Sequence, residues 1–168
     1  MNENGYIRKI DELGRIVIPK ELRQRLKIQE GENLIINCLD KNINLSKYSY
    51  VGNNKEFVKQ IGDKVSQLFD LNVFVSDSEH IIYSNISLEN KETSSVIRNY
   101  IISRESTKLT SLRITEIDEL QNNIYLEPII SNSVCIGLVI VNSIKTEADI
   151  AKIAKLISHT ISSFLKVS

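Results

Sequence analysis

Tryptophan is absent from this chain of 168 residues, and cysteine and histidine each occur only twice. Cys38 and Cys135 are far apart in the sequence, and each lies within an apolar run. Neither has a CxxC partner or a histidine at ligand spacing, so the sequence contains no zinc motif. We therefore predict two buried, reduced thiols, and we expect no metal and no cofactor.

Long hydrophobic runs are also missing. No segment approaches the ~20 apolar residues that a helix needs to span a bilayer. The first five residues are polar, unlike the start of a signal peptide. We therefore expect a cytoplasmic protein with no membrane partner.

Catalytic motifs are missing as well. HExxH, P-loop, GxSxG and GxGxxG patterns do not occur. Asp118 and Glu119 are adjacent, so they face apart on any regular element. His80 beside a predicted turn and His159 on the polar side of the last predicted helix are expected to be exposed to solvent. These residues do not form a nucleophile–base pair or a carboxylate pair, and we predict that the protein is not an enzyme.

An excess of one charge sign is absent from the whole chain, which has 21 basic and 21 acidic residues. The balance changes locally, because residues 1–27 contain seven Lys or Arg against four Asp or Glu. A bias confined to one segment indicates a positive face on one domain rather than a generally basic protein.

The basic segment has the pattern of a hairpin followed by a short helix. Two β-like runs, 6–10 and 15–18, flank the turn-forming sequence Asp11-Glu12-Leu13-Gly14. Pro19 then opens a helix of about two turns, because its fixed φ suits a helix start and its missing N–H is not needed there.

Two more β-like runs, 34–39 and 43–48, flank a turn at Asp40-Lys41-Asn42, and Gly31 lies where a permissive backbone is needed. The β-β-α-β-β order within 50 residues buries too little apolar surface to offset its ordering entropy. We therefore predict that this domain is an interleaved dimer, in which a second copy covers the strand edges.

Basic side chains gather on this domain. Lys20, Arg23 and Lys27 recur at helical spacing, while Arg8, Lys9 and Arg15 lie on the adjoining runs. Neighbours in a strand point to opposite faces, so only one of Arg8 and Lys9 is expected to join the helix stripe. The stripe is either a solvated surface or a nucleic-acid face, and we favour the second. The candidate DNA-binding residues are Arg8, Lys9, Arg15, Lys20 and Arg23.

The sequence from Gly5 to Arg23, GYIRKIDELGRIVIPKELR, resembles the swapped-hairpin domain of AbrB-type bacterial transition-state regulators. The resemblance continues through Gly31 to residue 48. It implies a dimeric β-barrel that binds double-stranded DNA, and it places Arg8, Arg15 and Arg23 where the family carries DNA-contacting arginines. Gln24 departs from the pattern, since relatives often have a second arginine there.

The rest of the chain, 55–168, is predicted to be a second domain after a linker at 49–54. Gly52 and the pair Asn53 and Asn54 interrupt both periodicities in that linker. The expected order is α-β-β-α-β-β-β-α, which resembles a GAF domain with an antiparallel sheet. The fold class is therefore α+β, with domains at 1–50 and 55–168. The expected elements are 55–70, 72–76, 80–84, 91–104, 109–114, 124–130, 134–142 and 148–167.

Three functions remain open on the sequence. The pairing of an AbrB-like head with a GAF-like tail resembles sporulation regulators of spore-forming Firmicutes, whose second domain would sense a signal, join dimers into a tetramer, or both. Some antitoxins share the head, and a GAF module with a purely oligomerising role is the third reading. By resemblance, Arg98, Arg104, Lys108 and Arg113 lie in the region that rims a GAF pocket, where they could attract an anionic metabolite, but we favour a solvated helix and loop surface for them. The sequence therefore leaves open whether the second domain binds a small-molecule ligand.

Overall fold

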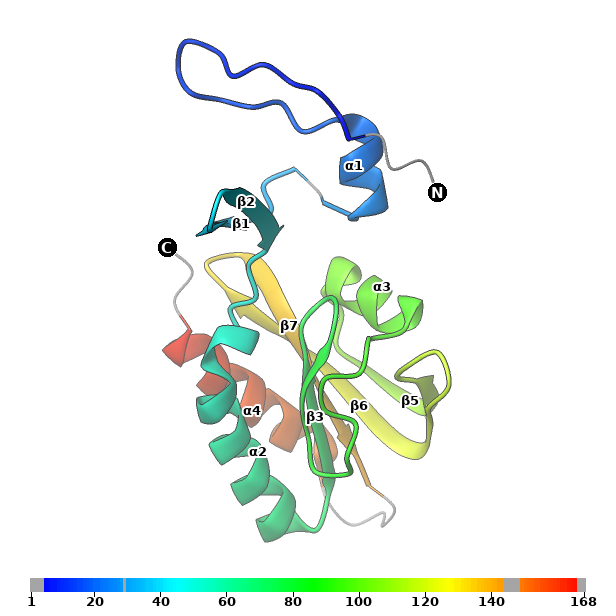
Figure 1. Ribbon diagram of the computed structural model, residues 1–168. Coiled ribbons are helices and arrows are strands. Elements are labelled where there is room, and N and C mark those ends of the chain that lie inside the picture. Colours follow the sequence, from blue (N-terminus) through cyan, green and yellow to red (C-terminus); the bar gives the residue numbers. More distant parts are fainter. Residues whose placement is uncertain (1–4, 29, 144–148, 166–168) are drawn as a thin grey trace. The chain divides into compact units, whose positions relative to one another are not determined.

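The computed structural model describes residues 5–28, 30–143 and 149–165 (Figure 1). The chain divides into two compact units, Met1–Tyr48 and Ser49–Ser168.

The first unit has little regular structure within one chain. Figure 1 draws two extended arms that run beside each other to a turn and lead into α1, Lys20–Arg25. An antiparallel hairpin follows, formed by β1, Leu34–Leu39, and β2, Asn42–Lys47, with Leu34 opposite Lys47 and Leu39 opposite Asn42. Gly31 has a φ of +79°, the left-handed conformation for which glycine is suited.

The expected strands at 6–10 and 15–18 are not strands within this single chain. At the turn, Asp11 donates its N–H to the carbonyl of Arg15 at 3.1 Å, but no ladder continues along the described arms. A strand is defined by its hydrogen-bonded neighbour, and these arms have no such ladder with any residue that the structure describes. The prediction of strands was therefore wrong for the isolated chain.

Apolar side chains of the first unit are left exposed. Among its described residues only Pro19 is buried, and Ile7 is 91% exposed. Cys38 is exposed on β1, so its predicted burial is wrong for the single chain, because nothing in this unit covers the hairpin. The large exposed side chains of this unit are Tyr6, Ile7, Ile10, Leu13, Ile16, Val17, Leu26, Ile36, Leu39, Ile43 and Tyr48.

The second unit is an α/β domain with a central antiparallel sheet of order β4-β3-β7-β6-β5. The fold class expected from the sequence is thereby confirmed. Its elements are η1 (Gly52–Asn54), α2 (Lys55–Phe69), β3 (Asn72–Ser76), β4 (Ile81–Ser84), α3 (Ser95–Ser103), β5 (Thr107–Arg113), β6 (Glu119–Ser131), β7 (Val134–Asn142) and α4 (Ile150–Phe164).

The sheet separates two hydrophobic cores. Along β3, Val73 and Val75 belong to the core shared with α2 and α4, while Phe74 belongs to the core shared with α3. This alternation follows from the two-residue repeat of a strand. In Figure 1, α2 and α4 lie side by side, and the rings of Phe57 and Phe164 stack with centroids 3.8 Å apart.

Helix α4 is attached to the sheet by hydrogen bonds as well as by apolar packing. The hydroxyl of Ser158 donates to the carbonyl of Pro128 at 2.7 Å, and that of Ser131 donates to the carbonyl of Leu165 at 2.6 Å. These contacts satisfy polar groups that the packing buries. The expected helix ran from 148 to 167, and residues 148, 166 and 167 lie outside the described residues.

Two boundaries differ from expectation. Val51, within the expected linker, is completely buried in the core under α2 and α4, so the second unit already includes it. The helix expected from Lys91 begins only at Ser95, because the hydroxyl of Ser94 caps it by accepting the N–H of Ile97. The preceding residues bridge to the β4 region instead, where Ile81 donates to the carbonyl of Lys91 at 2.9 Å.

Candidate nucleic-acid interface

The turn between the two arms is built around Asp11. Its Oδ1 accepts the N–H of Leu13 at 3.0 Å and the N–H of Arg15 at 2.8 Å. Gly14 completes the turn with a φ of +75° and donates its N–H to the carbonyl of Asp11 at 2.9 Å. An aspartate that binds the backbone two residues onward is a typical turn former. The local sequence therefore forms this turn without help from the rest of the fold.

Arg15 is tied to the same carboxylate. Its Nε lies 2.7 Å from Oδ2 of Asp11, while the side chain stays 71% exposed. The hydrogen bonds from the backbone and the side chain of Arg15 hold the pKa of Asp11 below its usual range. The sequence-based reasoning missed this contact, although the four-residue spacing across a turn was the signal that could have revealed it.

Arg8 and Lys9 lie on the first arm, and both are exposed. The guanidinium of Arg8 lies 5.9 Å from the centroid of the Tyr6 ring, within the range of a cation–π contact. One of its Nη groups also donates to the carbonyl of Ile7 at 2.8 Å. These contacts hold Arg8 close to its own arm and leave much of its guanidinium open to a partner.

Lys20 and Arg23 are exposed on α1, three residues apart, as the helical spacing predicted. Lys27 is not on this stripe. The helix ends at Arg25, and Lys27 has a φ of +53°, so its backbone has left the helical path. The carbonyl of Lys27 accepts a hydrogen bond from Nζ of Lys47 at 2.8 Å. The three-residue stripe expected from the sequence is therefore reduced to Lys20 and Arg23.

The basic residues expected around a GAF pocket do not share one environment. Arg98 is half-buried, whereas Arg104, Lys108 and Arg113 are exposed. An Nη group of Arg104 donates to the carbonyl of Ser133 at 2.9 Å, so this side chain supports the β6–β7 turn.

A groove of about 510 Å³ lies elsewhere in the second unit and carries acidic and amide groups. Tyr83 is buried nearby and donates its hydroxyl to Asp63 at 2.9 Å. Burial raises the pKa of Tyr83 to about 12. Tyr83 is therefore a core residue. The groove is lined by Asp63, Ser66, Gln67, Asp70, Leu71, Asn72, Asn85 and Asn142.

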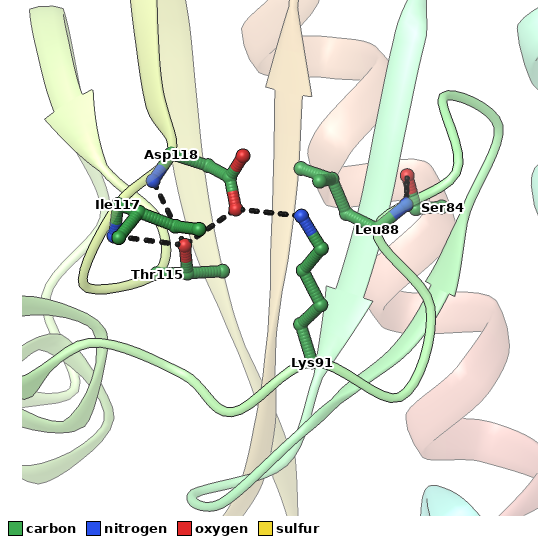
Figure 2. Close-up of polar contacts among 6 residues, drawn as sticks. All are labelled: Ser84, Leu88, Lys91, Thr115, Ile117 and Asp118. Carbon is green, nitrogen blue, oxygen red and sulfur yellow. Dashed lines mark hydrogen bonds and ion pairs between the residues drawn. The ribbon is translucent and has the colours of Figure 1, made fainter.

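A polar network fastens the loop after β4 to the β5–β6 turn (Figure 2). Oδ2 of Asp118 lies 2.9 Å from Nζ of Lys91 and accepts the hydroxyl of Thr115 at 2.6 Å. The hydrogen bond from Thr115, followed by the contact with Lys91, holds the pKa of Asp118 below its usual range. The loop between the end of β4 and Lys91 inserts Leu88 into the core beneath α3. The face of the sheet that packs against α3 is thus covered by residues of the same chain.

Comparisons with known proteins agree with this two-part organisation. Residues 54–167 match the family described as stage V sporulation protein T C-terminal, transcription factor. Residues 7–49 match the family described as antidote-toxin recognition MazE, bacterial antitoxin. The family match of the second unit and the likeness of the head to a transition-state regulator together define a two-domain transcription regulator. The chain belongs to the stage V sporulation protein T family.

The relatives divide in the same way. Stage V sporulation protein T of Bacillus subtilis (strain 168) is 32% identical over an alignment of 152 residues, and the match covers 85% of this chain and 85% of that protein. The transition state regulatory protein AbrB of the same organism is 52% identical over 48 residues, covering 29% of this chain and 50% of AbrB. The resemblance of the head to AbrB-type regulators is therefore confirmed.

Two solved structures align with about two thirds of the chain. A methyl-accepting chemotaxis protein segment has a TM-score of 0.51 at 12% identity, covering 65% of this chain and 86% of that structure. The cofactor-binding GAF domain of the nutrient sensor CodY from Clostridium difficile has a TM-score of 0.43 at 10% identity, covering 66% of this chain and 90% of that structure.

Among the described residues, no helix has both the length and the apolar character to cross a membrane.

Proposed function

We propose that this protein regulates sporulation genes as a homo-oligomer that binds double-stranded DNA through Arg8, Lys9, Arg15, Lys20 and Arg23 of its head. The observation that carries the proposal is the exposure of these five cationic side chains on one small unit. Because such a regulator acts on chromosomal DNA, we place it in the cytoplasm and assign it no enzymatic activity.

A second copy of the head is the partner that the first unit requires. Its two arms form no backbone ladder with other described residues beyond the turn, and Ile7, Leu13 and Val17 are each at least 75% exposed. An interleaved dimer would pair the arms and bury these side chains together, which removes both the edge and the exposed apolar surface. We therefore assign dimerisation to residues 1–50. Sedimentation equilibrium of this segment should show a folded dimer, and a folded monomer at micromolar concentration would contradict the assignment.

Electrostatics gives the DNA contact a measurable signature. Arg8, Arg15 and Arg23 of two protomers bring about six positive charges to the duplex, and six phosphate contacts give a slope of log K against log salt of roughly −5. Arginines that read guanine edges make the slope shallower, and their loss relaxes sequence preference. Binding of a duplex by the full chain and by the three alanine variants, measured across a salt series, tests this. A slope near zero would contradict an electrostatic DNA face.

The second unit is proposed to join two dimers. Leu68 on α2 and Leu156 and Phe164 on α4 are between 56% and 76% exposed, although both helices otherwise pack on the sheet. A second copy could cover these side chains and form a tetramer. Light scattering should give a tetramer for the full chain and a dimer for Leu156→Glu. A dimer for the unchanged chain would remove this part of the proposal.

The match of residues 7–49 to an antitoxin family favours a second candidate, a toxin-neutralising protein. The folded second unit argues against it, since a toxin-binding tail of that kind is expected to be disordered, whereas Ser49–Ser168 forms a five-stranded sheet with two cores. Genome-wide DNA occupancy in sporulating cells distinguishes the two. Enrichment at promoters supports the regulator, and specific retention of a toxin without promoter enrichment supports the antitoxin.

A further inference from the structure

Asp11 is the one acidic residue that contacts a proposed DNA-binding side chain in the described part of the chain. Its Oδ1 accepts two backbone N–H groups, from Leu13 and Arg15, and these contacts form the turn. Its Oδ2 pairs with Nε of Arg15 at 2.7 Å. One carboxylate therefore shapes the backbone and also restrains the guanidinium that follows.

The atom that Asp11 contacts determines what remains available on Arg15. Within the described part of the chain, neither Nη group of Arg15 has a protein acceptor. A guanidinium reads guanine by donating two N–H groups to O6 and N7 of the base. An arginine held through Nε keeps its two Nη groups for this purpose, and it has less rotamer freedom to lose on binding.

We propose that Asp11 is a positioning residue for sequence recognition: it holds Arg15 through Nε so that the two Nη groups meet a guanine edge. This inference rests on the proposed DNA-binding function. The carboxylate also places a negative charge beside the phosphates. Asp11 therefore weakens binding to DNA of any sequence while it strengthens the preference for the correct one.

Glu12 provides a matched control. It is exposed, adjacent to Asp11 and of the same charge, but it makes no hydrogen bond or ion pair within the described residues. Glu12→Gln removes a negative charge from the turn and leaves Arg15 untouched. In Asp11→Asn, Oδ1 still accepts the two backbone N–H groups, while an amide NH₂ replaces Oδ2. A donor then faces the Nε donor, so the contact with Arg15 is lost.

The test uses the full-length protein and two duplexes, one recovered by in vitro selection with the unchanged protein and one with the same bases scrambled. Fluorescence anisotropy gives Kd for each, and the ratio of the two Kd values measures discrimination. Both Asp11→Asn and Glu12→Gln should bind the scrambled duplex more tightly. Only Asp11→Asn should lower discrimination, by about 10-fold, within the range for loss of a bidentate base contact.

Arg15→Ala and the double variant Asp11→Asn/Arg15→Ala complete the cycle. If Asp11 acts through Arg15, adding Asp11→Asn to Arg15→Ala should leave discrimination unchanged. Unaltered discrimination in Asp11→Asn would overturn the positioning role, while a loss of discrimination in Arg15→Ala would still support DNA reading by Arg15. If Asp11→Asn raised Kd by the same factor for both duplexes, the positioning role would also be overturned, since Asp11 would then stabilise only the turn. Unchanged Kd values for Arg15→Ala would overturn the roles of both residues.

Discussion

Gly62 offers a sharp test of how the second unit is packed. It lies in the middle of α2, where glycine costs about 1 kcal/mol relative to alanine in an exposed helix. On helix propensity alone, Gly62→Ala should therefore stabilise the protein. The tertiary structure predicts the opposite, because a Cβ at this position would overlap the ring of Tyr83 and would lie 2.6 Å from its Cδ1.

The Tyr83 ring has little room to move away. Tyr83 is 1% exposed, and its hydroxyl donates to Asp63, which lies on α2 next to Gly62. Overpacking of a filled core costs about 1–3 kcal/mol, and disturbing the hydroxyl contact adds about 1 kcal/mol. After subtraction of the propensity gain of about 1 kcal/mol, the net loss of unfolding free energy should be about 2 kcal/mol.

Urea unfolding of the full chain, followed by circular dichroism, measures this difference. The exposed helix position Gln60 provides the control, since Gln60→Ala should change stability by less than 0.5 kcal/mol, a typical surface effect. In a Tyr83→Leu background the added methyl group has space, so Gly62→Ala should become neutral or stabilising there. A stabilising effect of Gly62→Ala in the unchanged protein would refute the packing argument.

Three further outcomes are expected. The pKa of Tyr83 should be about 12 in the folded protein against its usual 10.0. Its contribution to stability is therefore complete below pH 10 and is lost as pH rises from 10 to 12. Absorbance titration of the phenolate, with Tyr83→Phe as the reference, measures this pKa. Thr115→Val removes the acceptor for the N–H groups of Ile117 and Asp118, so both amides should exchange hydrogen faster, whereas protection at Leu138 in β7 should stay unchanged. Asp118 contributes to the same turn with a lowered pKa, so that contribution is present above its usual value of 3.8 and should decrease as pH falls below it, which amide exchange of Ile117 across an acid series would reveal.

The sequence by itself determined the features that depend on local chemistry. The run Asp11-Glu12-Leu13-Gly14 forms a turn because an aspartate can accept its neighbours' N–H groups and a glycine can adopt a positive φ. Strands β3 and β7 have the bounds that their apolar runs predicted, and α2 begins at Lys55 as expected. The nearly continuous apolar runs of the two strands match their burial on both faces of the sheet.

Only the tertiary structure decided how segments far apart in the sequence meet. Val51 looked like part of a linker, because its short segment shows no apolar periodicity. In the structure it fills the core beneath α2 and α4. Residues 91–93 had helical composition, but pairing with the β4 region holds them extended until Ser94 caps α3. The Lys91–Asp118 pair and the close approach of Gly62 to the Tyr83 ring likewise join positions more than 20 residues apart.

The head shows the same division most clearly. Its sequence specified exposed basic residues, a turn and a hairpin, all of which form within a few residues of one another. The two arms are not strands, because no backbone ladder joins them to any described residue beyond the turn. Local chemistry thus determines which groups face the solvent, whereas backbone pairing and core formation depend on what the fold or a second copy brings alongside.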